Sequence, residues 1–108
     1  MKFTTHNQHR VSLGGTLMVG TIQAQLCQLT RAFGQPMSND PRVAAEWRLR
    51  FEDGLVASIY CWNQELPGQT EVITWRIGGA GQFMVARVHE AFRSAVIAAQ
   101  DQAREQAA

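Results

Sequence analysis

Arginine and aromatic side chains recur at alternate positions in three segments of this chain and could form one recognition surface. Arg48 and Arg50 lie in the first segment, Tyr60 and Trp62 in the second, and Arg76 in the third. Aromatic rings offer stacking worth roughly 1 to 3 kcal/mol per nucleic-acid base, and guanidinium groups pair with phosphates or carboxylates. These residue types favour recognition of a nucleotide or an acidic protein surface over a covalent reaction.

The element that would position most of these side chains is a β-hairpin around Asp53-Gly54, and two registers compete for it. A two-residue loop pairs Phe51 with Val56 and places charged residues on the apolar face. A three-residue loop, with Gly54 in the left-handed conformation, pairs Phe51 with Leu55. We adopt the second register, which collects the apolar side chains on one face: Trp47, Leu49, Phe51, Leu55, Ala57, Ile59 and Cys61. The opposite, open face then carries Arg48, Arg50, Ser58, Tyr60 and Trp62.

The segments before the hairpin predict a strand and a helix. We expect a strand over residues 11–19, interrupted by two glycines, and a helix over residues 21–33 with Thr21 as its N-cap. Gly34 then stands at the C-cap position and Pro36 follows shortly after.

The segments after the hairpin predict one more strand and a second helix. Residues 71–77 alternate so that Arg76 points away from the core, and it extends the open face if this strand neighbours the hairpin. The glycine run 78–81 is expected to break the strand and to lead into a C-terminal helix. The fold class is therefore α+β, a mostly antiparallel sheet (strand, helix, three-stranded meander, helix) with the helices packed on one face.

Length and composition predict a single domain. The 108 residues divide into a flexible arm at 1–10, one α+β domain at 11–100 and a frayed tail at 101–108. A formal charge of +1 gives no global attraction to nucleic acid or membrane, so any binding must be local. With no signal-peptide pattern and no apolar run of membrane-spanning length, we expect a cytoplasmic protein.

The residues that could do chemistry in other ways have simpler interpretations. His6 and His9 share a polar terminal segment, and His89 has no nucleophile placed beside it by the sequence. Cys27 and Cys61 lack the spacing of a zinc site, and we expect both to be reduced, although a bridge between them stays open. We therefore expect no enzyme, no metal and no cofactor.

Gly78 and Gly79 open a glycine-rich turn before the second helix, where free N–H groups could attract an anion. The turn lacks both the GKS/T and the dinucleotide fingerprints, so a plain strand-to-helix turn is favoured. We nevertheless include both glycines with Arg76 among the candidate binding residues.

Several motifs resemble a family of small uncharacterised proteins of tailed bacteriophages and prophages. The resemblance covers residues 12–97 and is carried by the following motifs: Leu29-Thr-Arg-Ala-Phe-Gly-Gln-Pro36, Glu46-Trp47, Phe51-Glu-Asp-Gly-Leu-Val-Ala-Ser-Ile-Tyr60-Cys-Trp62 and Trp75-Arg-Ile-Gly-Gly79. This chain departs from the family pattern at Cys61, Asn63 and Arg76, where the family has an acid, a lysine and a histidine, and its insertion after the hairpin is shorter. The resemblance implies a phage origin and this fold, and it supplies no activity.

Together these features predict a small non-enzymatic phage accessory protein in the cytoplasm of the bacterial host. We expect it to inhibit a bacterial defence component, either by binding a host protein or by sequestering a small signalling nucleotide. The alternative is a nucleic-acid-binding accessory module, which the near-neutral charge disfavours. The open face also makes a homodimer a reasonable expectation.

Overall fold

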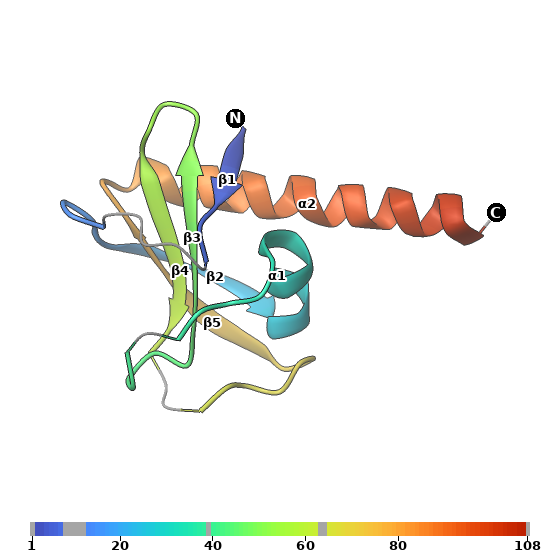
Figure 1. Cartoon of the computed structure of the whole chain (residues 1–108), viewed down its shortest axis with the longest axis horizontal. Helices are drawn as coiled ribbons and strands as arrows, with labels where there is room; N and C mark the ends of the chain where they lie inside the picture. The colour runs from blue at the N-terminus through green and yellow to red at the C-terminus, as the bar shows by residue number, and fades with distance from the viewer. Residues whose placement is uncertain (1, 8–12, 39, 63–64, 108) are drawn as a thin grey trace.

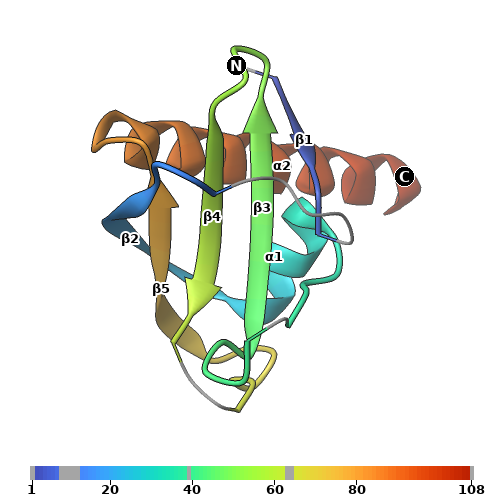
Figure 2. The same ribbon diagram turned by 60° about the vertical axis from the view of Figure 1, so that its left-hand side comes forward.

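A computed structural model describes residues 2–7, 13–38, 40–62 and 65–107 of the chain. It contains five strands and two helices in its described part, in the order β1 (Phe3–Thr5), β2 (Leu17–Gln25), α1 (Leu26–Phe33), β3 (Ala45–Phe51), β4 (Val56–Cys61), β5 (Val72–Gly79) and α2 (Phe83–Ala107). The strands form one antiparallel sheet in the order β1-β3-β4-β5-β2. Both helices lie behind the sheet in Figure 2. The predicted α+β class is confirmed.

The β3–β4 hairpin has the predicted three-residue loop. Phe51 and Leu55 are opposite each other, and the Phe51 N–H donates to the Leu55 carbonyl at 2.9 Å. Gly54 adopts a φ of 87°, which a side chain would strain. Trp47 pairs with Ile59, as this register requires. The predicted apolar face is buried except at Leu55, which is only partly buried.

Two tryptophans form the centre of the core. Trp47 and Trp75 are fully buried and meet edge to face with ring centroids 5.2 Å apart. The Trp47 indole N–H donates to the Gly34 carbonyl at 2.7 Å, and that of Trp75 donates to the Ala24 carbonyl at 3.0 Å. Because each buried N–H has an acceptor, the rings contribute apolar burial without an unsatisfied donor.

The predicted boundary between the first strand and helix is wrong. Thr21 lies in β2, which continues to Gln25, and α1 begins at Leu26. Ile22 and Ala24 are both buried and alternate with exposed neighbours, which is the period of a strand. Gln25 and Gln28 form a capping box that starts the helix, with the Gln25 N–H donating to Gln28 Oε1 at 2.9 Å. Residues 11–12 of the predicted strand lie outside the described residues.

The predicted end of the first helix is confirmed. Helix α1 ends at Phe33, and Gly34 follows with a φ of 89°. The Gly34 N–H donates to the Thr30 carbonyl at 2.8 Å, which satisfies one of the last carbonyls of the helix.

Regular secondary structure extends closer to both chain ends than the sequence predicted. Phe3–Thr5, expected within a flexible arm, forms β1 on the outer edge of β3, with Thr4 opposite Arg50. Phe3 explains the pairing, because its ring contacts Phe33 and Phe51 at centroid distances of 5.6 and 6.1 Å. At the other end α2 extends to Ala107, past residue 101 where the tail was expected to begin, and it projects beyond the sheet in Figure 1.

Strand β5 also runs further than expected. Gly78 and Gly79 belong to the strand and do not break it. Glycine occurs at both positions because neighbouring atoms leave no room for a side chain. A Cβ on Gly78 would lie 2.5 Å from Ser58 Oγ, and one on Gly79 would lie 2.8 Å from Met84 Cβ. These glycines let β5 pass close to β4 on one face and to α2 on the other.

Candidate binding surface on the sheet

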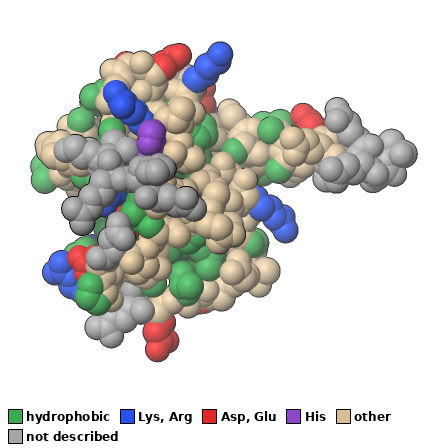
Figure 3. Space-filling view, in the orientation of Figure 1, with side chains coloured by type: hydrophobic (Ala, Val, Ile, Leu, Met, Phe, Trp, Pro, Cys, Tyr) green, Lys and Arg blue, Asp and Glu red, His purple; other side chains and the backbone are tan. Residues whose placement is uncertain are grey.

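The face of the sheet opposite the helices carries most of the predicted recognition residues. Tyr60 pairs with Arg76, and Ser58 pairs with Gly78, so β4 and β5 are neighbours as the prediction required. Arg48 on β3 lies opposite Ser58. This register places the predicted residues of three adjacent strands around one point of the sheet. Figure 3 shows charged and hydrophobic side chains together at the lower left of the molecule, around the loop that precedes β3.

Trp62 lies at the centre of this surface. Its side chain is 47% exposed, and its ring contacts Tyr60 edge to face at 6.3 Å. Two guanidinium groups lie over the ring, that of Arg42 at 5.0 Å and that of Arg76 at 5.7 Å from its centroid. Such contacts hold the arginines in place while leaving part of the ring accessible to a ligand.

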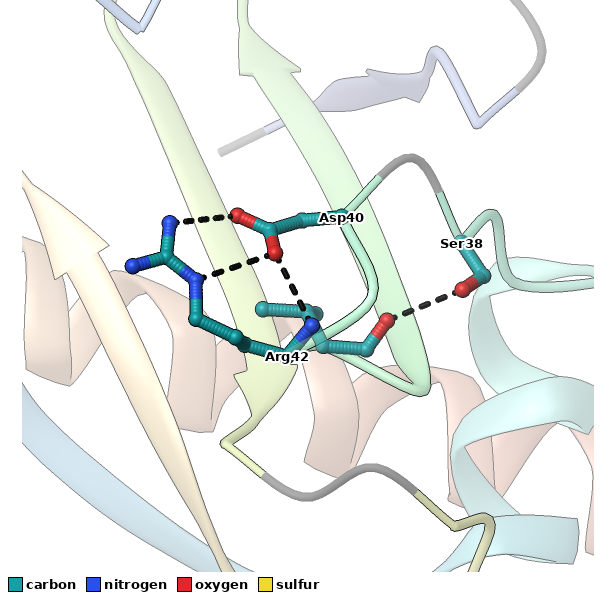
Figure 4. Close-up of polar contacts among 4 residues, drawn as sticks. Ser38, Asp40 and Arg42 are labelled. Carbon is teal, nitrogen blue, oxygen red and sulfur yellow. Dashed lines mark hydrogen bonds and ion pairs between the residues drawn. The ribbon is translucent and has the colours of Figure 1, made fainter.

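Arg42 also belongs to this surface, although the sequence did not predict it. Figure 4 shows how Asp40 fixes it: the carboxylate accepts from Nη2 at 2.9 Å and Nε at 3.1 Å, and from the Arg42 backbone N–H at 2.9 Å. The side-chain hydrogen bonds from Arg42, followed by the backbone one, lower the pKa of Asp40 from its usual 3.8 to about 2. The Asp-Pro-Arg spacing of residues 40–42 was the one signal available, since it permits this turn.

Two hydrogen bonds hold the loop before β3 in its conformation. Ser38 donates from its hydroxyl to the Val43 carbonyl at 2.9 Å, and the Val43 N–H donates to the Asp40 carbonyl at 2.9 Å. A tight turn held in this way limits the positions that Arg42 can take. The arginine is thus organised before any ligand arrives, which reduces the entropy lost on binding.

A shallow hollow of about 290 Å³ lies beside Trp62. Its lining comes from the turn before β2, from the loop before β3, from strands β2, β3, β4 and β5, and from the end of β4: Leu13, Thr16, Leu17, Met18, Asp40, Val43, Glu46, Arg48, Ser58, Tyr60, Trp62 and Gly78. Leu17 and Met18 are 76% and 54% exposed. Large apolar side chains this exposed, next to Trp62, form the sort of patch that proteins use for contact with a partner.

The face is less open than the sequence predicted. Ser58 is only 3% exposed, and Arg48 forms an ion pair with Glu46 at 3.1 Å in which both side chains are mostly buried. The turn before β2 explains part of this covering, because Leu13 and Thr16 line the same hollow. Arg48 therefore forms the floor of the surface and is not an exposed contact.

Arg50 and Gly79 lie apart from the surface. Arg50 lines a separate hollow of about 470 Å³ at the other end of the hairpin, together with Lys2, Thr4 and His6. Gly79 faces Met84 on the helix side of the sheet. Gly78 is the one glycine of the predicted pair that lines the hollow beside Trp62.

The glycine-rich run before α2 does not form an anion-binding loop in this geometry. Gly78 pairs with Met18 and Ser58, and Gly79 pairs with Leu17, so both belong to the sheet. The backbone between strand and helix is a plain turn, in which the Met84 N–H donates to the Gly81 carbonyl at 3.0 Å.

The histidines and cysteines of the described residues lie apart from the Trp62 surface. Among the described residues, no group of three or more His, Cys, Asp and Glu side chains could hold a metal ion. His6 hydrogen-bonds Thr4, and His89 contacts the Thr21 carbonyl at 2.9 Å. Cys61 is buried and Cys27 partly buried, and both are free thiols. His9 lies outside the described residues.

The comparisons with known proteins add no relative to this picture. Neither the protein-family models nor the curated proteins nor the solved structures contain a match to this chain. Within the described part of the chain, no helix has the length and apolar character needed to cross a membrane.

Proposed function

We propose that the protein is a small non-enzymatic accessory protein of phage type that inhibits a bacterial defence component by binding a host protein. The observation that supports this most is the half-exposed Trp62 ring with two guanidinium groups over it, and with Leu17 and Met18 exposed in the same hollow. The phage setting rests on the sequence resemblance, and the binding mode rests on the surface.

The composition of the surface matches that of protein interfaces. Trp, Tyr and Arg are the residues most enriched among those that dominate binding energy, and such residues lie in clusters surrounded by weaker contacts. Trp62, Tyr60, Arg42 and Arg76 form a cluster of this kind. The apolar Leu17 and Met18 would exclude water around it.

The charges favour a protein over a signalling nucleotide. Asp40 neutralises Arg42 and Glu46 neutralises Arg48, so a phosphate approaching the hollow meets two carboxylates as well as the arginines. A hollow of about 290 Å³ is also at the lower limit of ordinary small-molecule sites. The same carboxylates and the formal charge of +1 weigh against nucleic acid, although the aromatic rings would permit stacking.

The decisive experiment compares partner capture by matched variants. The tagged protein is expressed in the phage host, crosslinked in the cell and purified, alongside Trp62→Ala, Arg76→Ala and the control Val72→Ala. Val72 is 61% exposed on the same strand as Arg76 and lies outside the surface, so its removal should change neither fold nor binding. We expect one host protein to co-purify with the parent and the control and to be lost from the two surface variants.

Two further measurements separate the alternatives. The plating efficiency of the phage is then measured on a host that carries the captured defence protein. It should be high when the host expresses the unmutated protein and low when it expresses Trp62→Ala. Calorimetry of the purified protein against cyclic nucleotides should show no heat of binding. A tight nucleotide complex that depends on Arg76 would contradict the proposal and would show that the protein sequesters a nucleotide instead.

A further inference from the structure

The hollow beside Trp62 has a buried hydroxyl in its floor. Ser58 on β4 is only 3% exposed and lines the hollow. It lies in the sheet between Arg48 and Gly78, on the face away from the helices. Within the described part of the chain, its hydroxyl has no hydrogen-bond partner. Buried polar groups in proteins are almost always hydrogen-bonded, so this hydroxyl is suited to bond a group that enters the hollow.

Gly78 keeps the space beside this hydroxyl open. A Cβ at Gly78 would lie 2.5 Å from Ser58 Oγ and 3.8 Å from Tyr60 Cε1. The backbone conformation does not require glycine here, because Gly78 is not among the glycines with positive φ. The missing side chain therefore matters for the space that it leaves, and that space gives access to the Ser58 hydroxyl.

The other lining residues supply paired polar groups and an apolar wall. Asp40 pairs with Arg42 at 2.9 Å and Glu46 with Arg48 at 3.1 Å, so the charges of the hollow cancel. The Thr16 hydroxyl donates to a main-chain carbonyl at 2.6 Å. The apolar wall comes from the turn before β2, from β2 and from the loop before β3: Leu13, Leu17, Met18 and Val43.

We propose that the hollow binds a tyrosine side chain of the partner, with its phenol hydrogen-bonded to Ser58 and its ring against the apolar wall. This inference rests on the proposed function, because it names the side chain by which the bound host protein enters the surface. Tyrosine has a rigid apolar body and a polar tip, and it loses little conformational entropy on binding. A volume of about 290 Å³ is small for a ligand site and suits one side chain.

Other side chains match the hollow less well. Phenylalanine would cover the wall but would leave the Ser58 hydroxyl unpaired beneath an apolar ring. Lysine or glutamate would lose hydration in a hollow whose own charges are already paired. Asparagine or serine would reach the hydroxyl but would leave the apolar wall in water.

The test titrates the ¹⁵N-labelled full chain with soluble probes and follows its amide chemical shifts. The probes are N-acetyl-tyrosinamide, N-acetyl-phenylalaninamide and N-acetyl-lysinamide. We expect the tyrosine probe to shift the amides around Ser58 and to bind about fivefold more tightly than the phenylalanine probe, which is the effect of one hydrogen bond. The lysine probe should not bind. In Ser58→Ala the two aromatic probes should bind equally, because the hydroxyl that distinguishes them is gone.

Two further variants separate the wall from the floor. Met18→Ala removes part of the wall, so it should weaken both aromatic probes by a similar factor and leave the preference for tyrosine unchanged. Val72→Ala lies outside the hollow and should bind like the parent. Thermal melts of all variants establish that each is folded.

Equal binding of the two aromatic probes by the parent would overturn the inference, and so would the absence of any shift up to the solubility limit of the tyrosine probe. Tighter binding of the lysine probe would overturn it as well. If Trp62-dependent capture of a host protein occurs without a preference for tyrosine, the proposed function stands and this inference fails. If the tyrosine preference depends on Ser58 but no host protein is captured, this inference stands and the proposed function fails.

Discussion

Asp53 in the hairpin turn and Arg87 on α2 form an ion pair with an Oδ2–Nη1 distance of 2.7 Å. The Arg87 guanidinium also lies over the rings of Phe51 and Phe83, at 5.7 and 5.3 Å from their centroids. Asp53 has a second role, because its Oδ1 accepts the Leu55 N–H at 3.2 Å within the turn. One carboxylate therefore shapes the hairpin loop and joins it to the long helix.

This pair predicts an acid-sensitive part of the stability. The side-chain hydrogen bond from Arg87 is the main reason that the pKa of Asp53 lies below its usual 3.8. A lowered folded-state pKa stabilises the fold above pH 3.8, and that stabilisation is lost as the pH falls through the lowered value. The melting temperature of Asp53→Asn should therefore fall less between pH 6 and pH 2 than that of the parent.

The control for this comparison is Asp101→Asn, whose carboxylate forms no ion pair among the described residues. Its melting curve should follow the parent at every pH. If Asp53→Asn also follows the parent, the pair with Arg87 does not form in solution.

The hairpin could be predicted from sequence because its determinants are local. Asp53-Gly54 fixes the loop, and the alternation of apolar residues decides between the two registers, since only one of them keeps charge off the buried face. The position of Trp62 and Tyr60 followed from the same parity. These parts of the surface needed no long-range information beyond the adjacency of β4 and β5.

The boundary at β2 and α1 could not be predicted in the same way. Ile22 and Leu26 are four residues apart, which fits a helix, yet Ile22 and Ala24 also fit a strand. Residues 21–25 form a strand because they pair with β5, about 50 residues further along the chain. No local sequence pattern predicts this pairing. Arg42 was missed for a related reason: its place over Trp62 depends on the fold of a loop and on its bond to Asp40.

Gly54 tests the loop geometry directly. At a φ of 87° a β-branched side chain is strained, and Gly54→Val should lose about 1 to 3 kcal/mol of stability. The cost is conformational, because the space around a Cβ at this position is open. Gly54→Asn should lose less, since Asn tolerates positive φ, and Gly68→Ala should behave like the parent. Chemical denaturation measures all three, and a Gly54→Val midpoint equal to that of the parent would exclude the three-residue loop.

Gly78 tests the floor of the candidate surface. An added Cβ would approach Ser58 Oγ to 2.5 Å, so Gly78→Ala should cost roughly 1 to 3 kcal/mol through overpacking. Ser58→Ala removes the obstructing oxygen, and the double variant should therefore recover most of the loss. Urea denaturation of the two single variants and the double variant completes the cycle. Purely additive costs would show that β4 and β5 are not packed in this register.

Trp62 should report the charge of its own surroundings. Trp47 and Trp75 are fully buried whereas Trp62 is 47% exposed, so dissolved quenchers should reach Trp62 fluorescence selectively and Trp62→Phe should remove most of the quenching. A unit charge about 6 Å away in water is worth roughly 0.7 kcal/mol, which concentrates a small anion about threefold. Asp40 neutralises Arg42, whereas the Arg76 guanidinium lies 5.7 Å from the ring centroid and forms no ion pair among the described residues, so iodide should quench more strongly than caesium at low ionic strength. Arg76→Ala should reduce the difference, and salt near 1 M should abolish it, because the screening length is then about 3 Å. Equal quenching by the two ions at low salt would show that Arg76 does not lie beside Trp62 in solution.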